Sequence, residues 1–295
     1  MDVDGYAVHC IEEGAGPPIV LVHGFGGSTF TYREVIPLLA RHHRVIAFDL
    51  KGCGYSARGD TGLSHGDQVA MIHGLFDVLG VEQCTLVGHS MGGAVVQRFA
   101  ATYPQRVDAL VLAASATGDE RLAQHLARGL PQAVAVTPVV IMLEALTSAV
   151  SHAVRQSTLL SRALGSASYL RLVSARLVRL WSYDASALTE DVIEGYARPM
   201  RIRGTLAATL RSVSDATRDA PINRSQITMP VLLLFAPDDD VAPLSSAAQL
   251  QAALPRAQLR VIAGAAHLLL EERPAECAQA IEKFVQDEVT SHGEA

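Results

Sequence analysis

The pentapeptide Gly-His-Ser-Met-Gly at residues 88–92 constrains the fold of this 295-residue chain more than any other segment. Residues 84–87, an apolar and partly β-branched run, are typical of a buried strand, and residues 93–100 are typical of a helix start. A serine at so sharp a strand-to-helix turn has strained dihedral angles, and flanking glycines avoid the clash that a Cβ would make. The motif also arises by chance, so its interpretation depends on matching elements elsewhere in the chain.

A glycine-rich loop follows another strand-like run. Residues 18–22 are apolar, and His-Gly-Phe-Gly-Gly follows at 23–27. Such a loop lets the backbone N–H of Phe25 approach a reacting carbonyl beside the N–H of Met91, which follows Ser90. Two N–H donors aimed at one point form an oxyanion hole, so we expect one here.

An acid and a histidine follow two later strand-like runs. Residues 230–236 lead into Pro-Asp-Asp-Asp at 237–240, and residues 258–262 are followed by Gly-Ala-Ala-His at 264–267. The carboxyl ends of parallel strands meet at one edge of an open α/β sheet, where such sheets carry their sites. We therefore expect Ser90, an acid and a histidine to lie together.

Strand-like and helical runs alternate along much of the chain. Residues 45–49 and 107–113 are typical of strands, and residues 67–79 carry apolar side chains at the three- and four-residue spacing of a helix. This alternation predicts an α/β fold with a mostly parallel, doubly wound sheet that is flanked by helices.

Together these segments resemble the α/β-hydrolase fold family. The segments that carry the resemblance are 23–27, Asp-Leu-Lys-Gly-Cys-Gly-Tyr-Ser at 49–56, 88–92, Asp239 with Pro243, and His267. The chain order of serine, acid and histidine is that of the family. The resemblance implies a core in two parts, residues 1–114 and 223–295, with a helical cap inserted at 115–222.

The resemblance also implies roles for individual residues. Ser90 would be the nucleophile, His267 the general base and acid, and Asp239 the residue that orients His267. The backbone N–H groups of Phe25 and Met91 would form the oxyanion hole. Supporting residues in the same loops are His23, Gly24, Gly26, Gly88, His89 and Gly92. We expect His89 to shape the loop rather than to catalyse.

The choice of acid rests on the family pattern. Asp239 lies three residues after the small residue Ala236 and four before Pro243, although many relatives have glycine at the first of these positions. Asp238 is the second candidate, and Asp119, which follows the strand-like run that ends at Ala113, is the third. The simpler alternatives are a plain turn serine and a surface-loop histidine, which the number of matching elements argues against.

The inserted segment offers the only clue to the substrate. One predicted helix has an apolar stripe marked by Tyr169, Leu172, Val173, Arg176, Leu177 and Leu180. Thr189 is expected to cap another helix whose first turn is acidic. Residues 129–143 carry no charge and are too short to span a membrane. They are typical of a helix packed on the core, and also of an apolar roof over an acyl or aromatic pocket.

Charge and cysteine usage exclude several classes of protein. The formal net charge of −6 lacks the basic footprint of a nucleic-acid-binding protein. The four cysteines have no paired spacing, and the first residues have no basic or apolar secretion segment, so we expect a cytoplasmic protein. No motif for a metal or an organic cofactor is present, and none is expected. Nothing in the chain is basic and amphipathic enough for stable membrane anchoring.

We therefore expect a serine hydrolase that cleaves a carboxylic ester of a small to medium, mostly apolar substrate through an acyl-enzyme. Ser-Met-Gly-Gly at 90–93 also resembles C–C bond hydrolases of ring-cleavage dienones, but those tend to carry Asn in place of His89. Thioester hydrolysis and perhydrolysis are further alternatives. Epoxide hydrolases and haloalkane dehalogenases use a carboxylate where this chain has Ser90. A ligand receptor with vestigial hydrolase activity is the remaining alternative.

Overall fold

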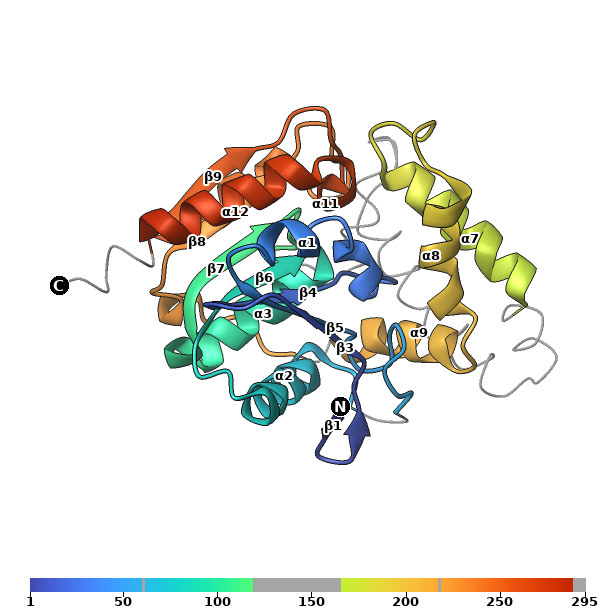
Figure 1. Cartoon of the computed structure of the whole chain (residues 1–295), viewed down its shortest axis with the longest axis horizontal. Helices are drawn as coiled ribbons and strands as arrows, with labels where there is room; N and C mark the ends of the chain where they lie inside the picture. The colour runs from blue at the N-terminus through green and yellow to red at the C-terminus, as the bar shows by residue number, and fades with distance from the viewer. Residues whose placement is uncertain (60–61, 119–165, 217–218, 289–295) are drawn as a thin grey trace.

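The computed structural model describes residues 1–59, 62–118, 166–216 and 219–288. Within them, seven strands form one sheet in the order β3-β5-β4-β6-β7-β8-β9 (Figure 1). The strands are β3 (Cys10–Glu13), β4 (Pro18–Val22), β5 (Arg44–Phe48), β6 (Cys84–His89), β7 (Val107–Ala113), β8 (Val231–Phe235) and β9 (Ala257–Val261). Within this sheet, only the pairing of β3 with β5 is antiparallel. The predicted mostly parallel sheet is confirmed.

The central strands are buried on both faces. Every residue of β6 and of β8 is buried. Parallel strands covered on both sides carry largely apolar runs rather than an alternating pattern, which is why β8 is apolar throughout and β6 has only Thr85 and His89 as polar side chains. A short antiparallel ribbon, formed by β1 (Asp2–Val3) and β2 (Tyr6–Ala7), lies outside this sheet.

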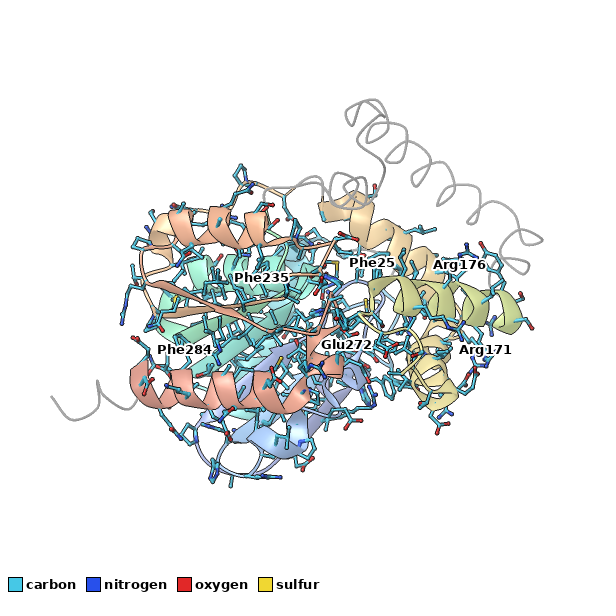
Figure 2. The ribbon with its side chains drawn as sticks, turned by 90° about the horizontal axis from the view of Figure 1, so that it is seen from above. Phe25, Arg171, Arg176, Phe235, Glu272 and Phe284 are labelled. Carbon is cyan, nitrogen blue, oxygen red and sulfur yellow. The ribbon has the colours of Figure 1, made fainter. Side chains whose placement is uncertain are left out.

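Helices cover both faces of the sheet. They are α1 (Ile36–Leu39), α2 (His65–Leu79), α3 (Met91–Thr102), α10 (Leu244–Ala253), α11 (Leu269–Glu272) and α12 (Pro274–Glu288), with the 3₁₀ turns η1 (Thr29–Tyr32), η2 (Pro104–Arg106) and η3 (Arg224–Gln226). In Figure 2, α10 and α12 lie on opposite sides of the sheet. This arrangement confirms a doubly wound fold.

Helix α2 begins two residues earlier than the spacing of its apolar residues predicts. Ser64 is the N-cap: its side chain accepts from the N–H of Asp67, whose carboxylate accepts from the N–H of Ser64. This capping box satisfies two N–H groups that the helix leaves unpaired. The first turn therefore precedes the first apolar residue, and periodicity alone does not detect it.

Three helices are described between β7 and β8. They are α7 (Ala167–Trp181), α8 (Glu190–Met200) and α9 (Thr205–Ala216). Thr189 caps α8 as predicted, because its side chain accepts from the N–H of Val192. The chain leaves and re-enters the sheet at neighbouring strands, since Leu110 of β7 is paired with Val231 of β8. The predicted boundaries at 114 and 222 stay predictions.

The predicted apolar stripe of α7 is wrong at four of its six positions, whereas Val173 and Leu177 are half-buried and line the cavity described below. Leu172 and Leu180 are 64% and 74% exposed, and Tyr169 and Arg176 are exposed as well. The buried residues are Leu170, Ser174, Ala175 and Val178. Small and polar side chains form part of this buried face, so a stripe defined by large apolar residues misplaces it.

Two sequence-based expectations concern other parts of the chain. Residues 129–143 and Asp119 lie outside the described residues. Among the helices that are described, none combines the length and the hydropathy that crossing a bilayer requires.

Candidate active site

Ser90 occupies a strained turn between β6 and α3. Its φ of 53° and ψ of −121° lie outside the regions that side-chain-bearing residues prefer. A Cβ at Gly88 would lie 2.4 Å from Cγ2 of Val96, and one at Gly92 would lie 2.4 Å from the carbonyl oxygen of Val22. The two flanking glycines are therefore required by close approach, as the sequence predicts.

The backbone around Ser90 is held by the neighbouring strand. The N–H of Ser90 donates to the carbonyl of Ala113 over 3.0 Å, and the Ser90 carbonyl accepts from the N–H of Ala116 over 3.1 Å. These bonds join the turn to the end of β7. Because the surroundings fix the strained conformation, the hydroxyl has a defined position.

Ser90, His267 and Asp239 lie in a hydrogen-bonded row. Nε2 of His267 is 2.9 Å from Oγ of Ser90, and Nδ1 is 2.9 Å from Oδ2 of Asp239. An ionised carboxylate only accepts, so Nδ1 carries a proton, and Nε2 of the neutral ring accepts from the serine hydroxyl. The three side chains come from the β6–α3 turn and from the loops that follow β8 and β9.

Asp239, and not Asp238, contacts the histidine. Oδ1 of Asp239 accepts from the N–H groups of Val241 and Ala242, each over 2.8 Å. Burial alone would raise the pKa of this carboxyl, but the charge and hydrogen bond of His267 and the two N–H groups outweigh burial and lower the pKa. Asp239 is 2% exposed, whereas Asp238 is on the surface.

The N–H groups of Phe25 and Met91 are the predicted donors of an oxyanion hole. Neither is paired with an acceptor within the described residues. Met91 is the first residue of α3, where a helix leaves its N–H groups unpaired and its dipole favours negative charge. Phe25 lines the same pocket as Ser90.

His23 holds the glycine-rich loop. Its Nε2 accepts from the N–H of Leu50 over 3.0 Å, so Nδ1 carries the proton and donates to the carbonyl of Gly24 over 2.8 Å. Burial lowers the pKa of His23, which keeps the ring neutral. A Cβ at Gly24 would lie 2.9 Å from Cβ of Ser90, so the loop approaches the serine as closely as glycine allows. Gly26 in the same loop has a φ of 65°.

His89 holds the backbone of His267. Its Nε2 lies 2.8 Å from the carbonyl oxygen of His267, which only accepts, so Nε2 carries the proton. Burial and the neighbouring charge of His267 lower the pKa of His89 to about 3. The ring is therefore neutral near pH 7, and its contact agrees with the expected loop-shaping role.

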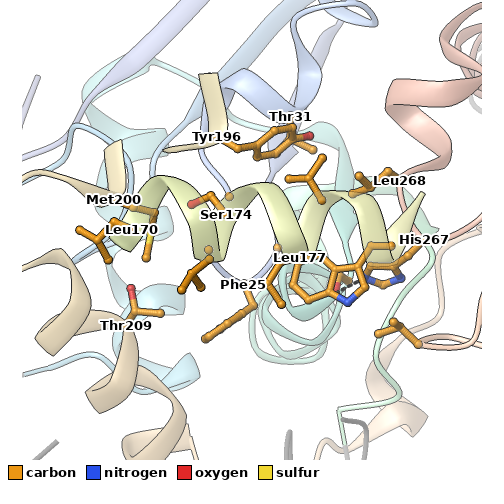
Figure 3. Close-up of a pocket in the computed structure, with 18 of the residues that line it drawn as sticks. Phe25, Thr31, Leu170, Ser174, Leu177, Tyr196, Met200, Thr209, His267 and Leu268 are labelled. Atoms are coloured by element: carbon orange, nitrogen blue, oxygen red, sulfur yellow. Dashed lines mark hydrogen bonds between the residues drawn. The ribbon is translucent and has the colours of Figure 1, made fainter. Parts of the chain in front are cut away.

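A cavity of about 210 Å³ extends away from Ser90. Its helical lining consists of Tyr169, Leu170, Val173, Ser174, Leu177, Val178 and Trp181 of α7, Tyr196 and Met200 of α8, and Leu206, Thr209 and Leu210 of α9. Figure 3 shows His267 and Leu268 at one end, and Leu170, Met200 and Thr209 at the other. None of the described lining residues is Asp, Glu, Lys or Arg.

Trp181 is a site residue that the motifs did not indicate. The indole is edge-on to the imidazole of His267, with ring centroids 5.7 Å apart and planes at 68°. It is the only tryptophan of the chain and the last residue of α7. Its single occurrence in the inserted segment was the available signal, but no spacing rule links it to a histidine 86 positions away.

Comparisons with known proteins agree with this architecture. The family model described as alpha/beta hydrolase fold matches residues 17–274. An uncharacterized protein of Mycobacterium tuberculosis is 30% identical over 292 residues, 96% of this chain and 79% of that protein. A 2-hydroxy-6-oxononadienedioate/2-hydroxy-6-oxononatrienedioate hydrolase of Cupriavidus pinatubonensis is 27% identical over 275 residues, 89% of this chain and 84% of that protein. A thermophilic esterase of Thermogutta terrifontis has a similar fold, with a TM-score of 0.74, 22% identity and coverage of 97% and 96%.

Proposed function

The chain belongs to the α/β-hydrolase fold family, and we propose that it is a serine hydrolase that cleaves carboxylic esters of small to medium, mostly apolar substrates. The observation that carries the proposal is the hydrogen-bonded row of Ser90, His267 and Asp239 at one end of a cavity whose described lining contains no Asp, Glu, Lys or Arg. The family accounts for a hydrolase, and the cavity lining supports an apolar ester.

In the first half of the reaction, Oγ of Ser90 attacks the ester carbonyl while Nε2 of His267 takes the hydroxyl proton. The negative charge that develops on the carbonyl oxygen is bound by the N–H groups of Phe25 and Met91. His267 then returns the proton to the leaving alkoxide as the C–O bond breaks. The acyl group is left on Ser90, and the alcohol departs.

In the second half, His267 takes a proton from water, whose oxygen attacks the acyl carbon. Collapse of the intermediate breaks the bond to Oγ, and the same proton returns to Ser90 as the carboxylic acid leaves. Asp239 keeps Nδ1 protonated and stabilises the imidazolium formed in each half. These steps use only side chains, backbone N–H groups and water.

The lining favours an ester over a dienoate. A dienoate carries a carboxylate. Moving a carboxylate from water into a cavity that offers no cation and few hydrogen-bond donors costs several kcal/mol of free energy, on the order of the penalty for any unpaired buried ion. The described lining offers no Lys or Arg. The relative from Cupriavidus pinatubonensis supports C–C bond hydrolysis as the second candidate function. A thioester would use the same steps, with a thiolate as the leaving group.

The first experiment measures initial rates on p-nitrophenyl esters from acetate to palmitate, for the wild type and Ser90→Ala. We expect a maximum at short to medium chain length and a loss of kcat of roughly 10⁴- to 10⁶-fold in the variant. Ser174→Ala, which removes a buried hydroxyl from the opposite wall of the same cavity, serves as the matched control. Retained activity in Ser90→Ala would disprove the proposal.

Two other results would redirect the assignment. A folded protein that ignores every ester but is labelled at Ser90 by a fluorophosphonate points to C–C hydrolysis, which a coloured dienone substrate then tests. Single-turnover labelling with a ligand-induced rise in thermal midpoint points to a receptor.

All four cysteines are free in the structure, which supports a reducing compartment such as the cytoplasm.

A further inference from the structure

Two adjacent glutamates at the end of α11 join the core to the α7–α8 helices. Oε2 of Glu272 accepts from the N–H of Ala266 over 2.9 Å. Oε1 of the same carboxylate accepts from the N–H of Tyr183 over 2.5 Å and from that of Asp184 over 3.4 Å. Glu272 is labelled in Figure 2, where the core meets α7. One side chain therefore bridges the loop that carries His267 and the turn that follows α7.

These bonds lie on both sides of the contact between Trp181 and His267. Ala266 immediately precedes His267, and Tyr183 is two residues after Trp181. The indole is edge-on to the imidazole, and both rings line the cavity. A shift of the α7 end relative to the histidine loop would break the bonds of Glu272 and separate the two rings together.

Glu271 makes a different connection. It pairs with the guanidinium of Arg33 and lies 3.4 Å from the hydroxyl of Tyr196 in α8. Arg33 in turn lies over the ring of Phe30, 4.0 Å from its centroid. Glu271 thus fastens α8 to the core, because its carboxylate contacts Arg33 and Tyr196.

We propose that Glu272 is a positioning residue that keeps Trp181 packed against His267. The indole packs against the imidazole, excludes water from that side, and holds Nε2 directed at Oγ of Ser90. A displacement of about 1 Å at such a group can cost on the order of 100-fold in rate. The effect on rate rests on the proposed function of His267, whereas the contact itself does not.

Because Trp181 is the only tryptophan, intrinsic fluorescence reports on this contact directly. The experiment compares Glu272→Ala and Glu272→Gln with the wild type, using emission maximum, collisional quenching by acrylamide, and kcat and KM on the best p-nitrophenyl ester. Glu276→Gln, on the exposed face of α12, is the matched control, and Glu271→Gln separates attachment of α8 from positioning of His267.

We expect Glu272→Ala to shift emission to the red, increase quenching and lower kcat by roughly 10- to 100-fold, with KM changed by less than about threefold. Glu272→Gln keeps one acceptor oxygen and should lie between the wild type and Glu272→Ala in each measurement. Glu271→Gln should lower the thermal midpoint while emission stays that of the wild type. Glu276→Gln should change none of these quantities.

Unchanged emission and quenching in both Glu272 variants would overturn the proposal, and so would a fluorescence change with unaltered kcat. If Glu272→Ala does not fold, the intermediate values expected of Glu272→Gln still decide the matter. If the wild type hydrolyses no ester, the rate of fluorophosphonate labelling of Ser90 replaces kcat. Failure of the wild type to react in either assay overturns the proposed ester hydrolysis. The emission and quenching of Trp181 still test its contact with His267 independently of activity.

Discussion

The loops at the edge of the sheet and the α7–α9 helices form the two sides of one cavity, and they are built differently. Ser90, Asp239 and His267 are at most 8% exposed, and each is fixed by hydrogen bonds to another element. The helices face the cavity with apolar side chains and leave Leu172 and Leu180 exposed on the outside. The loops on the sheet side fix the positions of these three side chains, and the helices determine the shape of the cavity.

The helices are attached at separate points. A Cβ at Gly195 of α8 would lie 1.9 Å from the ring of Phe30, so helix and ring touch there. In α9, Oγ1 of Thr205 accepts from Nε of Arg58 over 2.8 Å. Strand pairing, by contrast, joins each central strand of the sheet to its neighbours along its length. A change on the helical side should therefore alter selectivity before it alters the reaction.

Among the tests of this comparison between the two sides, the largest effect should come from the acid on the sheet side. Asp239→Asn removes the acceptor that keeps Nδ1 of His267 protonated, so we expect kcat to fall by about 10⁴-fold with little change in KM. Asp238→Asn, one residue away and exposed, should stay within about twofold of the wild type. Ester hydrolysis rates measure both. Equal losses of kcat in the two variants would contradict the assignment of Asp239, rather than Asp238, as the acid that orients His267.

A second test on the sheet side uses pH. The pKa of His89 is about 3 in the folded protein and ~6.5 in the unfolded chain, so between these values the unfolded state binds the additional proton. Stability therefore falls as pH falls below about 6. His89→Gln keeps a donor for the His267 carbonyl but does not titrate, and its free energy of unfolding should decline less steeply.

Urea unfolding at pH 7 and pH 5 measures this difference. The wild type should lose about 2 kcal/mol more than His89→Gln over that interval. His42→Gln, at an exposed position, is the control and should follow the wild type. Identical pH dependence in the wild type and His89→Gln would show that His89 is not the buried neutral group described above.

The smallest effect should come from the far wall of the cavity. Leu170 lies eleven residues before Trp181 on α7, roughly 16 Å along the helix from the end beside His267. Leu170→Ala enlarges that end, so we expect kcat/KM to shift toward longer esters by about tenfold. Leu172→Ala, on the exposed side of the same helix, should leave the chain-length profile unchanged. A profile that moves equally in both variants would mean that α7 acts through stability rather than shape.

Sequence-based prediction succeeded where one local rule decides the structure. The strands at 18–22 and 107–113 have the predicted bounds, because strands that are buried on both faces carry long, largely apolar runs. The meeting of Ser90, Asp239 and His267 follows from the common edge of parallel strands. The catalytic roles of these residues stay predictions.

Sequence-based prediction failed where contacts between distant segments determine which side chains are buried or paired. The buried face of α7 includes Ser174 because the helix lies over the cavity. The spacing of apolar residues along the sequence does not indicate that a helix faces a cavity. The bonds of Glu272 join residues nearly ninety positions apart. A charge next to another charge in a helix is more often solvated than bridging, so the sequence offered no reason to single out Glu272 rather than Glu271.

The pairing of β7 with β8 means that the chain departs from the sheet and returns to it at adjacent points. The N–H of Ala114 already donates to the carbonyl of Leu234, on the strand to which the chain returns. A graft of another helical segment between these strands would change the closure entropy slowly, by about 0.6 kcal/mol for each doubling of its length. Exchange of the segment between these strands would replace the helical lining of the cavity together with the contact of Trp181 on His267, while Ser90, Asp239 and His267 would stay on the sheet side.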